Sequence, residues 1–600
     1  MPQILVERNK IEPWPFIIFG LSLIFNLIYF IQLRSTPYYS NLYLDPAYYW
    51  RMAERIAAGN WLGSEVYEMS PLYSYLLAVL LKLGFSLGGI RLLQIFLASL
   101  TPVMTFYLGR RIMNRPSAII AGMTMTCYQT LLVYNNMIMK SWLSPLFFIS
   151  CALLLTAQDN RLFSRFAAGV VWGLLCLVRA NNLLILPLLM VWLYRQEQNK
   201  NKAVAAFILG LILVIAQVTI RNYVVSKEFV MITAGGGEVF YIGSLPENKG
   251  EYHPPPFVQP DPVREHDDFR AEARRRTQNR GLTRQQSSRF WFQEGLNLIA
   301  EKPTVYLKNL VRKFALFWNA FEIPDNHNVY FLKGILPILR LPLISFGVLA
   351  PLGLLGLGLH AYQKRSITLP LVLLAGSWLA IAPFFLYARF RLGIIPFLAL
   401  GTGFSLNYLW TCLKNRSYKT PALWVSALFF LLLFVHIPFA FERQKHQAIS
   451  HANLGSLYYR QGDYDSALNQ FDKAIRLDLF NELAKRYQVL TYVKLGDYKK
   501  ALADLEQLKP LLVSELDYYR LKFLVLKAQR DYEKLTKVCQ SILTLIPNDF
   551  EANFTLGALL GQAGRFQEAI THLEIAKAVH PDNENVRLNL DLAYQALQKK

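Results

Sequence analysis

The sequence predicts an all-α protein in which a domain of many membrane-crossing helices is followed by an α-solenoid of short helical repeats. Three observations lead to this prediction. The 600-residue chain is 53% hydrophobic and only 17% charged, whereas an ordinary soluble domain is about one quarter charged. Every long apolar run lies before residue 442, and the remaining tail repeats itself every 34 residues. We therefore expect two domains, at 1–441 and 442–600.

The net charge of +22 belongs almost entirely to the predicted membrane domain. Residues 451–600 hold 20 Lys+Arg and 19 Asp+Glu, which leaves 43 basic and 22 acidic side chains in 1–450. A basic and very apolar region is typical of a multi-pass membrane protein with cationic cytoplasmic loops. No nucleic-acid motif occurs, so we predict no nucleic-acid partner. The five cysteines are isolated in apolar or helical stretches, which argues against a disulfide framework or a zinc site.

A helix needs about 20 mostly apolar residues to cross a bilayer. We predict about eleven spans. The first, Trp14–Gln32, is too long for a signal-peptide core and no small-residue cleavage site follows it, so we expect it to be retained. The other spans are expected near 90–109, 118–135, 142–157, 166–180, 182–194, 203–220, 337–360, 369–387, 392–411 and 421–441.

The short loops between these spans predict the orientation of the chain. Every alternate loop is basic, and basic short loops stay in the cytoplasm. The residues concerned are Arg110, Arg111, Arg115, Arg161, Arg165, Arg195, Lys200, Lys202, Lys364, Arg365, Lys414, Arg416 and Lys419. We therefore expect the N-terminus on the cytoplasmic side of a plasma membrane. The loops 33–89 and 221–336 and the C-terminal domain are expected on the opposite side.

The tail consists of four repeats. Gly462, Gly496 and Gly564 recur in register, and Arg530 takes the place of the missing glycine. An Asp-Tyr pair follows in three units, then a small or aliphatic residue that lets paired helices approach. This pattern resembles tetratricopeptide repeats, with four units over 448–583 and a capping helix at 584–600. Such arrays bind a peptide or a partner protein in their groove, although a spacer or a stabilising cap would need the same residues.

The first outer loop carries the most suggestive local motif. Asp45 followed by Pro46 resembles a helix N-cap with proline at the first helical position. The next turns place Tyr49, Ala53 and Ile56 on one face, as expected of an amphipathic helix on a membrane surface. A second interfacial helix is predicted from the Pro-Leu-Tyr segment at Pro71 to about Leu83. From this segment alone, Asp45 could be a cap and nothing more.

The ordered combination of motifs resembles the GT-C glycosyltransferases of the family 39 type, which include protein O-mannosyltransferases and lipid A aminoarabinose transferases. The resemblance covers roughly the first 440 residues. No single motif is strict, and the order carries the weight. The segments are the Asp45 helix, the Pro-Leu-Tyr segment, Arg91 with Gln94, Val178-Arg179-Ala180-Asn181, Gly236-Gly237-Glu238-Val239-Phe240-Tyr241-Ile242-Gly243 and Ala388-Arg389-Phe390-Arg391.

The resemblance implies a polyprenyl-phosphate sugar as donor and an acceptor that is a protein, a lipid or a glycan. It implies that Asp45 is the general base or orients the acceptor hydroxyl. Arg389 and Arg391 are expected to bind the donor phosphate, since guanidinium groups match phosphate geometry. Lys140 occupies a position where several members have an acidic residue, and it is expected to contact the same phosphate.

That lysine leaves the second carboxylate and any divalent metal in doubt. Glu68 is a candidate substitute catalytic acid, and no metal ligand set is predicted, because one histidine such as His253 makes no metal site. Tyr49, Glu322 and Asp325 are predicted contacts of the acceptor. Two other functions stay open at this point. One is a polysaccharide polymerase or ligase of related architecture, and the other is a non-catalytic membrane scaffold that acts through its repeats.

Overall fold

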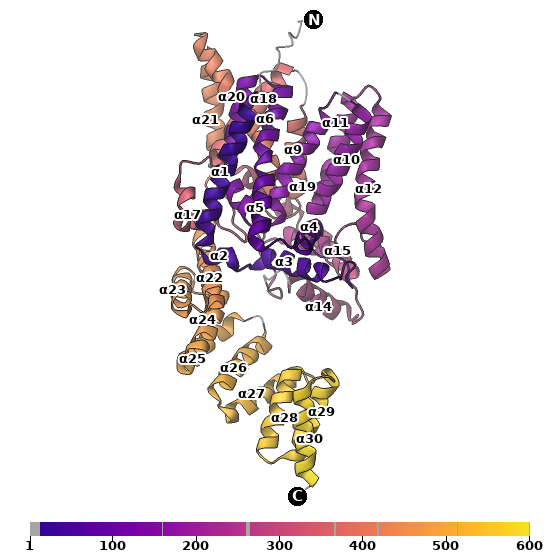
Figure 1. Ribbon diagram of the computed structural model, residues 1–600, viewed down its shortest axis with the longest axis vertical. Coiled ribbons are helices and arrows are strands. Elements are labelled where there is room, and N and C mark those ends of the chain that lie inside the picture. Colours follow the sequence, from indigo (N-terminus) through magenta and orange to yellow (C-terminus); the bar gives the residue numbers. More distant parts are fainter. Residues whose placement is uncertain are drawn as a thin grey trace. The chain divides into compact units, whose positions relative to one another are not determined.

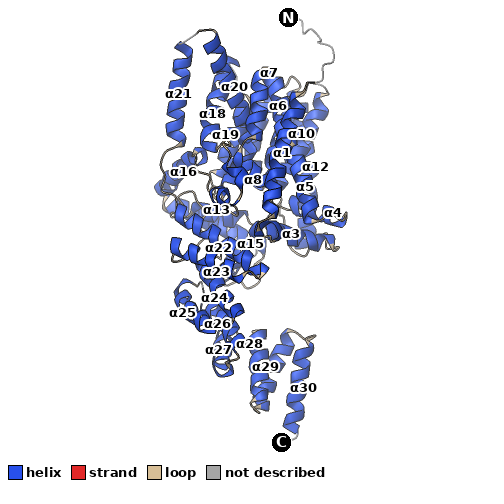
Figure 2. Cartoon of the chain, turned by 60° about the vertical axis from the view of Figure 1, so that its left-hand side comes forward, coloured by secondary structure: helices blue, strands red, loops and turns tan. Residues whose placement is uncertain are grey.

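The computed structural model describes residues 12–158, 160–259, 264–364, 368–416, 419–512 and 514–598. Within these ranges the regular structure is helical, and the one β-type contact is an isolated bridge between Tyr128 and Ile344 (Figure 2). The predicted all-α fold is confirmed. The chain forms two compact units, Met1–Ala440 and Phe441–Lys600. Of the basic residues used to predict orientation, Arg365 lies outside the described ranges.

Six helical segments of the first unit are long and apolar enough to cross a membrane. They are α1 (Trp14–Arg34), α5 (Leu87–Ala98) continued by α6 (Leu100–Ile112), α10 (Arg161–Val178), α12 (Lys200–Ser226), α18 (Phe346–Lys364), and the 3-10 helix η4 (Ala388–Ile394) continued by α20 (Ile395–Lys414). Shorter apolar helices are α4 (Leu72–Lys82), η1 (Lys140–Trp142) with α9 (Leu143–Leu155), α19 (Leu369–Ile381) and α21 (Lys419–Val435).

Several predicted spans differ from the helices observed. Those expected at 182–194 and 369–387 correspond to the shorter α-helices Leu186–Gln196 and Leu369–Ile381. The span expected at 118–135 is divided into α7 (Arg115–Thr126) and α8 (Gln129–Asn136). The backbone between them bonds elsewhere: Ile344 N donates to Cys127 O (2.9 Å), and Gln129 N donates to Ile344 O (3.1 Å). The span expected at 337–360 begins only at Phe346, since Ile344 just before it uses its backbone groups in these same two bonds.

The long helices of the first unit run side by side, whereas α3 (Leu44–Ala57), α14 (Glu265–Thr277) and α15 (Arg284–Glu301) lie across one end of this bundle (Figure 1). Both predicted outer loops thus supply helices to the same end. The remaining elements of the unit are α2 (Pro37–Ser40), α11 (Leu186–Gln196), α13 (Gly236–Ser244), α16 (Pro303–Trp318), α17 (Val329–Ile335), η2 (Ala180–Ile185) and η3 (Pro337–Arg340).

Glycines let the central helix pairs approach closely. A Cβ on Gly169 of α10 would lie 1.9 Å from Phe207 O of α12, and one on Gly210 of α12 would lie 2.1 Å from Phe166 O. Gly356 of α18 and Gly401 of α20 are related in the same way, since a Cβ on the first would lie 1.8 Å from the carbonyl oxygen of the second. Small residues at helix crossings are how membrane bundles pack without a hydrophobic force between helices.

The second unit is a succession of helix pairs. The pairs are α22 (Arg443–Gln461) with α23 (Tyr464–Leu477), α24 (Glu482–Leu495) with α25 (Tyr498–Leu508), α26 (Glu515–Gln529) with α27 (Tyr532–Leu545), and α28 (Phe550–Gln562) with α29 (Phe566–Val579), followed by α30 (Glu584–Gln598); the short η5 (Lys509–Leu511) follows α25. Gly462 and Gly496 end their helices with φ of +82° and +77°. Arg530 adopts φ +61° at the same register, a conformation that favours glycine.

Candidate active site

Three segments that are far apart in sequence meet at one buried cluster of charged residues. These are the first turn of α3, the loop 319–328 after α16, and η4, which begins the segment continued by α20. They contribute Asp45, Asp325 with Glu322, and Arg389 with Arg391 respectively. The structure therefore brings together five of the eight residues that the sequence predicted for the site.

Asp45 is not an N-cap, so the expectation that it caps its helix is wrong. Helix α3 begins one residue earlier, at Leu44, and its N-cap position is Tyr43 without a side-chain hydrogen bond. Leu44 has a φ of +51°, a left-handed conformation that costs a leucine roughly 1–2 kcal/mol. The carboxylate of Asp45 is buried and faces Arg389 instead of its own helix. Strain of this kind is common where a backbone positions a functional side chain.

Arg389 lies between two aspartates. Its Nη1 donates to Asp45 Oδ2 at 2.6 Å, and its Nε forms an ion pair with Asp325 Oδ2 at 2.5 Å. The second oxygen of Asp325 accepts a hydrogen bond from the hydroxyl of Tyr134 on α8 (2.8 Å). One guanidinium thus serves two carboxylates, and neither carboxylate has a full cation to itself.

The two aspartates differ in their protonation behaviour. Burial would raise the pKa of Asp45, but the charge and hydrogen bond of Arg389 outweigh it, and the pKa is lowered from its ordinary 3.8. For Asp325, burial and the negative charge of Asp45 outweigh the same arginine, and the pKa of that carboxyl is raised. Asp45 is therefore the carboxylate that stays ionised, the state in which a base can accept a proton.

Arg391, two residues further along η4, is engaged completely by the protein. It is 3% exposed. It pairs with Glu322 Oε2 (2.9 Å) and donates to the carbonyl oxygens of Phe317, Asn319 and Phe321. Glu322 is 1% exposed and also accepts from the hydroxyls of Tyr128 (2.7 Å) and Thr130 (2.8 Å). This pair holds the loop 317–322 against η4, and the polar atoms of Arg391 and Glu322 named here are all directed at other parts of the protein.

Two further cations lie near Arg389. Lys140 Nζ donates to Ser70 Oγ (2.9 Å) and stands 5.8 Å from the ring centre of Tyr49. Arg179, at the end of α10, lies over the ring of Phe390 (4.1 Å), and its Nε and Nη2 are buried without a hydrogen-bond partner. Among the residues that the structure describes, no carboxylate pairs with either cation.

Two other predicted residues lie around this centre. Tyr49 is fully buried and packs edge-on against Tyr73, and its hydroxyl has no hydrogen-bond partner. Glu68 forms an ion pair with Arg284, which also pairs with Glu65. Glu68 is thus committed to a separate charged group that ties the first outer loop to α15.

Sequence reasoning missed three residues of the site: Arg179, Tyr134 and His327. In the sequence, Arg179 appears only as part of a longer motif. Its position before Asn181 and Asn182, which interrupt the apolar run, is the local signal that indicates a functional residue. Burial lowers the pKa of His327 to about 3 and Arg389 adds to this, so its ring is neutral at ordinary pH. Its Nδ1 is 2.9 Å from the hydroxyl of Tyr43, and its Nε2 has no partner.

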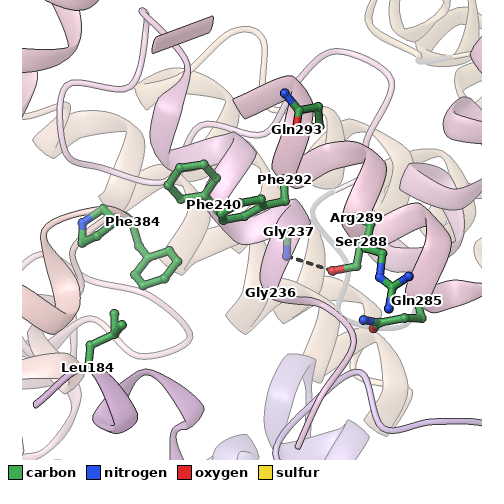
Figure 3. Close-up of a pocket in the computed structure, with 11 residues that line it drawn as sticks. Leu184, Gly236, Gly237, Phe240, Gln285, Ser288, Arg289, Phe292, Gln293 and Phe384 are labelled. Atoms are coloured by element: carbon green, nitrogen blue, oxygen red, sulfur yellow. Dashed lines mark hydrogen bonds between the residues drawn. The ribbon is translucent and has the colours of Figure 1, made fainter. Parts of the chain in front are cut away.

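A small cavity of about 20 Å³ adjoins Arg179, lined also by Asn181, Asn182 and Phe390, which is room for about one water. A larger cleft of about 690 Å³ is lined in part by Leu184, which also belongs to η2, and by Pro383 and Phe384, which follow α19. Its lining is mostly apolar. Figure 3 shows the rings of Phe240, Phe292 and Phe384 along it, with Arg289 and Gln285 toward one end.

The donor set of the cluster does not fit a metal site. Within the described ranges, no three His, Cys, Asp or Glu side chains are placed to share an ion. Asp45 and Asp325 meet on a guanidinium, which occupies the position between the carboxylates that a cation would take.

Comparison with known proteins concerns mainly the second unit. Residues 448–479 match the tetratricopeptide repeat family, which confirms the repeat predicted there. Anaphase-promoting complex subunit 3 of Schizosaccharomyces pombe is 32% identical over 167 residues, 27% of this chain and 20% of that protein. The chain thus spans about one fifth of the length of this relative.

Solved structures give two likenesses. YrrB, a tetratricopeptide-repeat protein with an unusual peptide-binding site, is 24% identical and covers 26% of this chain and 82% of its own, with a TM-score of 0.24. The oligosaccharyltransferase of Archaeoglobus fulgidus, in complex with zinc and sulfate, is 12% identical, covers 73% of this chain and 55% of its own, and has a TM-score of 0.39. Likenesses this low do not bear on the chemistry of the site.

Proposed function

We propose that this protein is an integral membrane glycosyltransferase that moves a sugar from a polyprenyl-phosphate donor to an acceptor hydroxyl outside the cytoplasm. One observation carries the proposal. An ionised buried carboxylate, Asp45, lies near two basic side chains, Lys140 and Arg179, with which no described carboxylate forms an ion pair. Transfer from a phosphate-linked donor to a hydroxyl needs both parts: a base for the hydroxyl proton and positive charge for the departing phosphate.

In the proposed reaction, Asp45 accepts the proton of the acceptor hydroxyl while the hydroxyl oxygen bonds to the anomeric carbon of the sugar. The bond between that carbon and the phosphate oxygen breaks, and its electron pair leaves with the polyprenyl phosphate. Lys140 and Arg179 stabilise the charge on this leaving group, which departs as an anion without needing a proton. Arg389 keeps Asp45 ionised and oriented, and Asp45 then releases its proton to water.

We propose that the donor binds at the small cavity beside Arg179 and in the larger cleft. Its phosphate would take the place beside Arg179, where the ring of Phe390 has to move aside because the cavity holds only about one water. Its apolar chain would occupy the larger cleft, which Leu184 and Phe384 help to line and whose lining is mostly apolar. Burial of isoprenoid surface in that cleft would supply binding energy away from the reacting atoms.

The alternation of basic loops supports a plasma-membrane protein with its N-terminus in the cytoplasm and this site on the other side. We propose that the repeats bind the acceptor or an assembly partner, since arrays of this class present extended surfaces to peptides and proteins. A chain ended at Ala440 tests this part. Transfer to a narrower or altered set of acceptors is expected, and an unchanged acceptor set would exclude recruitment by the repeats.

The enzymatic proposal is tested by giving membranes a panel of radiolabelled polyprenyl-phosphate hexoses and pentoses. Wild-type protein should move label from lipid to acceptor, and Asp45→Asn should slow this at least about 100-fold, the lower end of what a general base contributes. Glu54→Gln is the matched control, because Glu54 lies on the exposed face of the same helix and should leave the rate unchanged. Label that stays on lipid with every variant would leave the scaffold as the better explanation.

A further inference from the structure

The second unit carries an exposed apolar tip in its first repeat, defined here as residues 477–483. Phe480 is 75% and Leu479 is 65% exposed, the two highest values for large apolar side chains among the described residues of that unit. Leu477 and Leu483 are each 37% exposed. The tip is the turn between α23 and α24, and the Asp478 carboxylate fixes it by accepting from Phe480 N (3.0 Å).

The third and fourth repeats provide an internal comparison, because the turns between α27 and α28 and between α29 and α30 begin and end at the same register as the tip. One repeat of 34 residues after Phe480 stands Ser514, then Asn548 and Asp582. Leu479 is matched by Pro547 and Pro581 in the third and fourth turns. The fold of the repeat therefore does not require an aromatic or aliphatic pair at this turn. Only the first repeat has one, which indicates a reason particular to that repeat's place in the chain.

The first repeat follows directly on a segment fixed at the edge of the apolar helices. On α16, Leu307 (61%), Val311 (64%) and Phe314 (39%) form an exposed apolar stripe at helical spacing. The ring of Phe314 lies 6.3 Å from that of Phe434 near the end of α21. An amphipathic helix beside the end of an apolar helix such as α21 is typical of one that lies in the membrane interface.

Chain length keeps the tip within reach of that interface. The ring of Phe439 packs under the guanidinium of Arg312 on α16 (5.0 Å), and only residues 440–442 separate it from α22, a span of at most about 14 Å. Helix α22 has 19 residues and α23 returns antiparallel with 14. The five-residue difference brings the tip back to about 8 Å, along the helix axis, from the start of α22.

We infer that the tip of the first repeat inserts into the membrane surface and holds the repeat unit against the bilayer. The contact is apolar in character. Residues 472–486 carry four basic and three acidic side chains, which gives almost no net charge for anionic headgroups to attract. Leu479 and Phe480 supply the side chains that favour the interface of any phospholipid. We therefore expect the tip to insert equally well into zwitterionic and anionic lipid surfaces.

The full-length protein in phosphatidylcholine nanodiscs tests this inference. The photoreactive analogue p-benzoylphenylalanine replaces Phe480 in one sample and Asn548, its register equivalent, in the control. Lipid adducts should form at position 480 at least about fivefold more often than at 548. Raising NaCl from 0.05 to 0.5 M should leave the yield unchanged. Equal yields at both positions, a loss of adduct at high salt, or cross-links to a second copy or to the first unit would each overturn the inference.

A second measurement does not depend on the probe. Hydrogen exchange of the amides at 479–483 in nanodiscs should be at least about threefold faster in Phe480→Asp than in wild type, because the tip then leaves the lipid. Leu545→Ser in the third repeat is the control and should not alter exchange at the tip. Since Asp582 occupies this register in the fourth repeat, the aspartate is compatible with the fold. Unchanged exchange in Phe480→Asp would contradict membrane insertion.

Discussion

Arg389 and Arg391 lie two residues apart on the same 3-10 turn, yet the protein uses them in opposite ways. Arg391 is saturated by one carboxylate and three backbone carbonyls, and its partner Glu322 has two further hydroxyl donors. Arg389 is divided between Asp45 and Asp325, and the cations next to it have no acidic partner among the described residues. A saturated buried pair fixes a loop, whereas an under-compensated group leaves charge to interact with a ligand.

An Arg-x-Arg motif at a membrane edge is therefore not one functional unit. Both arginines fit a phosphate by chemistry, and the separation of roles arises only from what folds against each one.

The largest expected effect is on stability, at Arg391. Arg391→Lys keeps a charge for Glu322 but loses most of the bonds to three carbonyls, each worth about 0.5–1.5 kcal/mol. We expect the free energy of unfolding in detergent micelles to fall by about 2–4 kcal/mol. The activity of the molecules that remain folded should change little. A large loss of activity without destabilisation would return Arg391 to the phosphate site.

The same substitution at Arg389 should give the reverse result. A lysine has a single head group and cannot hold Asp45 and Asp325 at once, so Asp45 is misplaced, and small misplacements cost about 100-fold in rate. Arg389→Lys is therefore expected to lower kcat about 100-fold in the transfer assay. The loss of stability should be smaller than in Arg391→Lys, because no bonds to backbone carbonyls are lost and one aspartate keeps a cation. Equal effects of the two lysine variants on stability would remove the distinction between the arginines.

A smaller effect is expected at Arg179. If its unpartnered guanidinium binds the donor phosphate, Arg179→Gln loses a hydrogen bond between charged groups, worth about 1.5–3 kcal/mol. KM for the donor should rise at least about tenfold with a lesser change in kcat. Lys82→Gln, an exposed lysine of α4, is the control. An unchanged donor KM in Arg179→Gln would leave Lys140 as the phosphate contact.

The smallest effect is a shift along the pH axis. Because Arg389 holds the pKa of Asp45 below 3.8, wild-type activity should fall only when the pH drops below about that value. In Arg389→Gln, burial is no longer opposed, the pKa of Asp45 rises, and the acid limb should move up by about one to three pH units. A wild-type limb that already lies above 3.8 would point to Asp325, whose pKa is raised, as the base.

The sequence predicted the helical class, the repeats and the residues of the site better than it predicted their partners. Apolar length and the 34-residue period are local properties, which is why α1 and the repeat turns appear where expected. The division of 118–135 depends on backbone bonds between Cys127, Gln129 and Ile344, and no local signal reports them. Likewise, nothing near Asp45 indicates that it faces Arg389 and does not cap its helix. Pairings across hundreds of residues decide these points.

The contact between Asp45 and Arg389 joins residues 344 positions apart, and this has a consequence in time. At about 5–20 residues per second of synthesis, the aspartate emerges roughly 17–70 seconds before the arginine that keeps it in place. Until then neither Asp45 nor Asp325 has its cation, and both are costly to bury. The site is therefore among the last parts of the first unit to close, and any chain interrupted before η4 leaves both aspartates without their shared cation.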